Sequence, residues 1–120
     1  MELLAQVVSE FDVDENLASK ALGAVFTSVR MAMDTKTFAA VATAFPDVGT
    51  WMRDAPVTGG RTGEMLALAT PRTLRRNLSQ LGLAEPQIDR LGALAGKALR
   101  ESIPAEVFER ITVRLPMFAA

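Results

Sequence analysis

The stretch DENLASKALGAVFTSVRMAM, residues 14–33, decides the fold class of this chain. Its apolar residues recur at steps of three and four, a spacing that places them on one face of a helix and that a strand cannot use. Asp14 stands at the position of an N-cap, so we predict a helix from residue 15 to about residue 33. The face that we expect to be buried consists of Leu17, Ala21, Leu22, Val25, Val29 and Met33.

The same periodicity continues on both sides of this helix. It predicts shorter helices over 3–11 and up to Pro46, a second long helix over 85–101, and further helices that begin at Pro71 and at Pro104. Alternating runs of β-branched residues do not occur in the sequence. With 120 residues, of which 49% are hydrophobic, the chain is long enough to bury one core. We therefore predict an all-α protein, a compact bundle of about six helices.

The second half of the chain repeats the plan of the first half. Segment 11–46 aligns with segment 81–116 without a gap, and four of the aligned pairs are identical. Both segments end in an apolar residue followed by proline, Pro46 in one and Pro116 in the other. Because each half alone would bury little surface, we predict two similar three-helix units that pack together with pseudo-twofold symmetry.

The predicted single domain covers residues 1–120, with unit one at 1–46, a connector at 47–69 and unit two at 70–116. Three glycines fall within residues 59–63 of the connector, which is typical of a flexible linker. A phosphate-binding P-loop would need a Lys-Ser/Thr pair and a preceding strand, and the sequence supplies neither.

The two halves differ in charge, although the formal net charge is only −1. Residues 1–60 hold four Lys/Arg against eight Asp/Glu, whereas residues 61–120 hold nine against six. The small net charge gives no global attraction to nucleic acid or to an anionic membrane. The acidic and basic halves can pair within one molecule or head-to-tail between molecules.

The residue types that most often carry catalysis are missing. The sequence contains no His, no Cys and no Tyr, so the commonest general base, the common nucleophile–base pairs and the usual zinc ligands are unavailable. We therefore expect a protein that is not an enzyme and that holds neither a cofactor nor a metal. A disulfide is excluded as well.

The carboxylates are better explained as helix ends than as sites. Asp12, Asp14 and Asn16 begin like an EF-hand loop, but the sixth position is Leu17 instead of Gly and the twelfth is Gly23 instead of Glu. We interpret these aspartates as ending one helix and capping the next. The same interpretation, rather than an acid–base pair, applies to Asp34, Asp47 and Asp54.

Arg72, Arg75 and Arg76 form the densest group of positive charge. On a helix that begins at Pro71 they lie away from Leu74, so we expect them to face solvent together. Cations near a helix N-terminus oppose the helix dipole and do not stabilise that helix. Three interpretations stay open, namely a solvated face, a docking site for acidic residues of a partner or of unit one, and phosphate contacts with nucleic acid.

Soft apolar residues are more frequent than a small core needs. Met residues usually fill gaps in a core, but Met31 falls off the predicted buried face, and several others follow prolines that end helices. If these side chains are exposed together, they form an apolar surface for a partner. The candidate partner-binding residues are Met31, Trp51, Met52, Met117 and Phe118.

Short runs of the sequence resemble known families. The run AFPDV at 44–48, the Gly-rich connector and the run LSQLGL at 78–83 resemble the VcgC/VcgE-like family of uncharacterised bacterial proteins. The segment IPAEVF at 103–108 is similar to tandem-helix bacterial domains of unknown function. The resemblance implies a bacterial helical protein and brings no activity or site residues with it.

These observations favour a non-enzymatic helical module for protein interaction or self-assembly, a homodimer included. The chain has no secretory signal at its start and no apolar run long enough to span a bilayer, so we expect a cytoplasmic protein without a membrane span.

One alternative to protein interaction is the binding of a small apolar or lipid-like ligand, held between the units by Phe26, Phe38, Trp51 and Phe108. The other, disfavoured because few arginines make few phosphate contacts, is nucleic-acid binding through Arg72, Arg75, Arg76 and Arg100.

Overall fold

A computed structural model describes residues 3–54 and 71–119 of the chain. Every regular element within these ranges is helical, so the predicted all-α class is confirmed. The α-helices are α1 (Leu3–Phe11), α2 (Glu15–Ala32), α3 (Thr35–Ala44), α4 (Val48–Asp54), α6 (Pro71–Gln80), α7 (Glu85–Ser102) and α8 (Ala105–Arg114), and a 3-10 helix, η1, follows at Pro116–Ala119.

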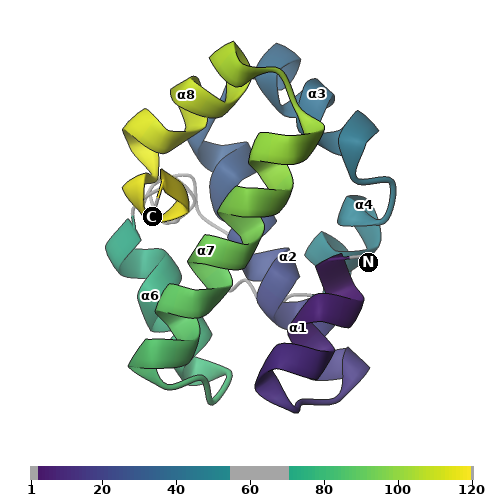
Figure 1. The fold of residues 1–120 in the computed structure, drawn as a ribbon, viewed down its shortest axis with the longest axis vertical. Helices are drawn as coiled ribbons and strands as arrows, with labels where there is room; N and C mark the ends of the chain where they lie inside the picture. Colours follow the sequence, from purple (N-terminus) through teal and green to yellow (C-terminus); the bar gives the residue numbers. More distant parts are fainter. Residues whose placement is uncertain (1–2, 55–70, 120) are drawn as a thin grey trace.

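The two long helices α2 and α7 form the centre of the bundle, and the shorter helices lie around them (Figure 1). Helices α1 and α6 lie toward one end of the bundle, and α3 and α8 lie toward the other end. Helix α1 contacts both α2 and α7, and α6 also contacts both long helices. Helix α4 packs along α2, as η1 packs along α7. The two halves are therefore joined through shared contacts and not through a narrow interface.

Local signals in the sequence fix the helix ends. The Asp14 carboxylate accepts a hydrogen bond of 2.7 Å from the backbone N–H of Leu17 and caps α2, as predicted. The Asp34 carboxylate accepts one of 2.6 Å from Thr37 and caps α3 in the same way. Gly82 has a φ of +99°, a left-handed conformation that suits glycine after a helix end. The predicted Thr70 cap lies outside the described residues.

The bounds of the helices repeat as the alignment of the two halves predicts. When 11–46 is aligned with 81–116, the bounds of α2 coincide with those of α7, and the bounds of α3 coincide with those of α8. Asp12, with a φ of +52°, corresponds to Gly82. The turns that follow agree as well, because Val48 N–H donates to Phe45 C=O and Phe118 N–H donates to Leu115 C=O. These are agreements of local backbone structure; the pseudo-twofold symmetry of the whole stays a prediction.

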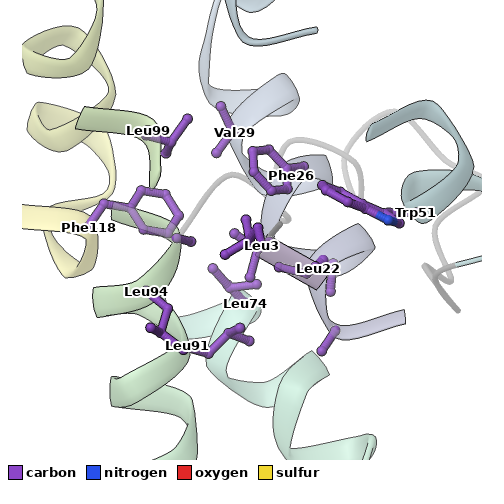
Figure 2. Packing of buried hydrophobic residues seen from close by; sticks show 14 of the residues in the cluster. Leu3, Leu22, Phe26, Val29, Trp51, Leu74, Leu91, Leu94, Leu99 and Phe118 are labelled. Carbon is purple, nitrogen blue, oxygen red and sulfur yellow. The ribbon is translucent and has the colours of Figure 1, made fainter. Parts of the chain in front are cut away.

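The core lies between α2 and α7 and is filled from almost every element. Figure 2 shows Leu22, Phe26 and Val29 of α2 facing the same interior as Leu91, Leu94 and Leu99 of α7. Leu3, Leu74 and Phe118 enter it from α1, α6 and η1. Burying side chains of this size stabilises the fold by about 1.5–3 kcal/mol each. One continuous core therefore includes both predicted units.

Helix α2 is buried on more faces than its apolar stripe predicts. Ser28 is only 1% exposed and Thr27 is 8% exposed, although both are polar. Leu17 and Met33, which we expected inside, are only partly buried at the two ends of the helix. Helix α4 packs along α2 and covers a side of it that the apolar stripe does not predict to be buried.

The chain does not leave the bundle after Pro116. Pro116 starts the 3-10 helix η1, and Phe118 in that helix is fully buried. The backbone of Phe118 lies against Gly96 of α7, where an added Cβ would come within 2.0 Å of the Phe118 carbonyl oxygen. Glycine at position 96 therefore allows the end of the chain to close over α7.

Candidate functional site

The main candidate for a binding surface is an open groove of about 610 Å³ between α2, α3 and α4. Half-buried Met31 of α2, Phe38 of α3 and Met52 of α4 line it. Gly49 of α4 lines it as well, and a Cβ built on Gly49 would meet no atom within 4 Å. The described lining residues are Thr27, Arg30, Met31, Phe38, Ala42, Pro46, Val48, Gly49, Met52 and Arg53, and we call this surface the Met31–Met52 groove.

The charge of the groove is positive. Arg30 of α2 and Arg53 of α4 both line it and both are exposed. No Asp or Glu is found among the described lining residues. Within the part of the chain that the structure describes, neither arginine forms an ion pair or stacks on an aromatic ring. The groove therefore combines an apolar lining with two cations that have no partner among the described residues.

The aromatic ring at the corresponding position of the second half is covered. Phe108 corresponds to Phe38, but it is only 8% exposed, and the guanidinium of Arg100 lies 5.1 Å from the centre of its ring. This is a distance at which a cation–π interaction is favourable. Phe118 corresponds to Val48 and places a buried ring in the turn after the last α-helix. Of the two corresponding rings, that of Phe38 in the first half is therefore the more open.

Two of the five residues predicted to form an exposed apolar surface are in the core instead. Trp51 is 4% exposed, and its ring lies 5.7 Å from that of Phe26, centre to centre. Phe118 is 0% exposed. The prediction that they are available to a partner is wrong, because α4 and η1 turn these faces onto the long helices. Met31 and Met52 do come together, in the Met31–Met52 groove; the side chain of Met117 lies outside the described residues.

The predicted arginine cluster is divided. Arg75 does not stand free, because it forms ion pairs with Glu85, at 3.2 Å, and with Asp89 on the neighbouring helix α7. Arg75 is still 36% exposed, so the expectation that the three arginines face solvent together stays a prediction, although the charge of Arg75 is matched by carboxylates. Arg76 is exposed, and the side chain of Arg72 lies outside the described residues. Arg75 ties α6 to α7 within the second half, a role that the spacing of the arginines alone does not indicate.

One ion pair joins the acidic half to the basic half within the molecule. Nε of Arg90 on α7 lies 2.7 Å from a carboxylate oxygen of Glu10 on α1. Both side chains are about half exposed, so the pair contributes at most about 1 kcal/mol to stability. At this contact, an acidic residue of the first half therefore pairs with a basic residue of the second half within one molecule.

The predicted aromatic pocket between the halves is not open where we placed it. Phe26 is fully buried and packs its ring 5.3 Å from that of Phe45, centre to centre, instead of lining a cavity. A smaller cavity of about 310 Å³ does lie near Trp51, between α1, α4 and α7. Its lining includes Asp47, Lys97 and Glu101, so it is partly charged and not the apolar pocket that was predicted.

Asp12, Asp14, Asp34 and Asp47 lie at helix ends or in turns, as predicted. The backbone N–H of Thr37 donates a hydrogen bond to the Asp34 carboxylate and is the main reason that the pKa of this carboxyl lies below its ordinary value of 3.8. A hydrogen bond from the Thr37 side chain and the positive charges of Arg110 and Lys36 lower this pKa further. Asp47 lies in the turn before α4, where its carbonyl accepts from Trp51 N–H. No group of three or more metal-ligating side chains gathers within residues 3–54 and 71–119.

Comparisons with known proteins found no matching family model, no similar curated protein and no similar solved structure. The VcgC/VcgE-like resemblance therefore stays a prediction. Among the described helices, none has the length and apolar character needed to cross a membrane.

Proposed function

We propose that this chain is a non-enzymatic helical module for protein interaction and that the Met31–Met52 groove is its contact surface. The observation that carries the proposal is the combination of half-buried Met31, Phe38 and Met52 in one open groove. Met side chains are flexible and polarisable, so they adapt to the side chains of a partner. Leaving three large apolar side chains partly in water costs hydrophobic free energy that a partner would recover.

We also propose that the two halves derive from one three-helix unit and that only the first retains an open surface. The coincident bounds of α2 with α7 and of α3 with α8 support the repeat. The ring of Phe108, which is buried beneath Arg100 where Phe38 is half-buried, supports the difference between the halves. Under this proposal, one chain offers one groove to one partner.

Position 49 allows a direct test of the contact surface. A photoreactive amino acid replaces Gly49, which lines the groove, and in a matched control it replaces Ser79, which is exposed on α6 and outside the groove. We expect irradiation of cells expressing the protein to give a discrete protein adduct from position 49 and none from position 79. Mass spectrometry identifies the partner, whose purified form must bind the wild type and not Gly49→Leu. Adducts of equal yield from both positions, or none from either, would overturn the proposal.

Self-association is distinguished by the mass of the adduct. An adduct of two chains from position 49, together with a dimer in light scattering that Gly49→Leu disrupts, assigns the groove to a second copy of this protein. An adduct with a different protein and a monomer in light scattering assigns it to a foreign partner. Both results agree with protein interaction, and each names a different partner.

A further inference from the structure

We infer that the Met31–Met52 groove binds an acidic amphipathic helix of its partner. This inference rests on the proposed function and adds the chemistry of the partner to it. Its first support is charge complementarity, because Arg30 and Arg53 line the groove while the described lining residues contain no carboxylate. Acidic side chains at the edges of a docked helix would pair with these two guanidiniums.

Three other arginines of the chain have partners that Arg30 and Arg53 lack. Arg75 and Arg90 are paired with carboxylates of neighbouring helices, and Arg100 lies over the ring of Phe108. Arg100 is the residue that aligns with Arg30 when the two halves are compared. Arg30 and Arg53 have no such contacts among the described residues, so both guanidiniums are available to carboxylates of a docked partner.

The architecture favours a helix over other peptide conformations. Strand addition needs an open sheet edge, and residues 3–54 and 71–119 contain only helices. Polyproline segments bind grooves lined by several aromatic rings, whereas Phe38 is the one aromatic residue among the described lining residues. Grooves between helices that are lined by Met and Phe accept the apolar face of an amphipathic helix, whose anchors recur at steps of three and four.

Labelled synthetic peptides test the inference on the full chain. One peptide, long enough for several helical turns, carries Leu at helical spacing with Glu on both flanks, and the matched peptide of the same length carries Lys at the Glu positions. Fluorescence anisotropy should show the acidic peptide binding about tenfold more tightly, because two exposed ion pairs each change affinity a few-fold. The preference should shrink as salt is raised, and the circular dichroism of the peptide should become more helical on binding.

Three variants test which residues cause the preference for the acidic peptide. Arg30→Glu with Arg53→Glu should reverse the preference between the two peptides, and Gly49→Leu, which fills the groove, should remove binding of both. Arg76→Glu makes a charge change on the exposed side of α6 and should leave both affinities unchanged. Each variant is checked for an unchanged helical spectrum and melting transition before binding is measured.

The outcomes separate this inference from the proposed function. Equal binding of the two peptides that Gly49→Leu abolishes would overturn the acidic preference and leave protein docking intact. Binding of dodecanoate that Arg30→Glu weakens, without binding of the acidic peptide, would assign the groove to a small anionic amphiphile and overturn the inference. A loss of preference in Arg76→Glu as large as in the groove variant would show that the effect is general charge and would overturn it as well.

Discussion

Gly96 lies directly beneath the backbone of Phe118, so closely that a Cβ at position 96 would come within 2.0 Å of the Phe118 carbonyl oxygen. The obstructing atom belongs to the backbone, so it cannot rotate away as the end of a side chain can. The contact joins the middle of α7 to the last helical turn of the described chain. It makes position 96 a sensitive test of the packing of η1.

Gly96→Ala should therefore destabilise the protein. We expect a loss of about 1–3 kcal/mol in the free energy of unfolding, even though alanine is the better helix former, because η1 must move outward. Gly49→Ala is the matched control, since its Cβ meets no atom within 4 Å, and it should gain up to about 1 kcal/mol. Urea titrations followed by circular dichroism measure both. A loss in Gly49→Ala equal to that in Gly96→Ala would contradict this account.

Phe118→Ala tests whether η1 belongs to the core. The side chain is fully buried, so its removal should cost about 3–5 kcal/mol and lower the melting temperature markedly. Val113→Ala on α8, where the valine is 79% exposed, should change stability by less than about 0.5 kcal/mol. Comparable effects in the two variants would mean that Phe118 does not pack as described.

Ala84→Asp should stabilise the second half. Ala84 has the extended conformation of an N-cap before α7 but no side-chain acceptor, whereas Asp14 caps α2 at the corresponding position. An aspartate should accept from the free backbone N–H groups of the first turn and add about 0.5–2 kcal/mol to the free energy of unfolding. Ala84→Leu, which offers no acceptor, is the control. The proposed cap is disproved if thermal unfolding shows the two variants to be equally stable.

Asp34 should make stability depend on pH in acid. Hydrogen bonds from Thr37 lower the pKa of this carboxyl in the folded state, so its stabilising contribution is complete above its ordinary value of 3.8. The contribution is lost as the pH falls through the lower folded-state pKa. Asp34→Asn keeps a capping oxygen but cannot titrate. The stability difference between wild type and Asp34→Asn should be constant above about pH 5 and shrink below about pH 4; a difference independent of pH would refute the assignment.

Much of the fold can be predicted from the sequence because its signals are local. The period of the apolar residues predicts both long helices to within one residue at each end, 15–33 against Glu15–Ala32 and 85–101 against Glu85–Ser102. Asp14 and Gly82 act through their own backbone neighbourhoods, so their roles as cap and left-handed residue need no knowledge of the tertiary structure.

The candidate site is harder to predict because it depends on which helix covers which face. Met31 stands out in the sequence as lying off the apolar stripe, but only the packing of α4 on α2 brings it together with Met52 and Phe38. The prediction that Trp51 is exposed was wrong for the same reason, because the sequence of a short helix does not indicate which of its faces packs against the core. The Met31–Met52 groove with its two arginines is a relationship among three helices, and no single stretch of the sequence contains it.

The close approach of η1 to α7 limits which residue position 96 can carry. The first half carries Phe26 on its long helix and Val48 at the start of α4, and the second carries Gly96 and Phe118 at the corresponding positions. Because the obstructing atoms belong to the backbone of Phe118, a side chain at position 96 excludes the observed position of η1 whatever residue stands at 118. A related chain that carries a larger residue at this position should therefore hold its final 3-10 helix farther from the long helix.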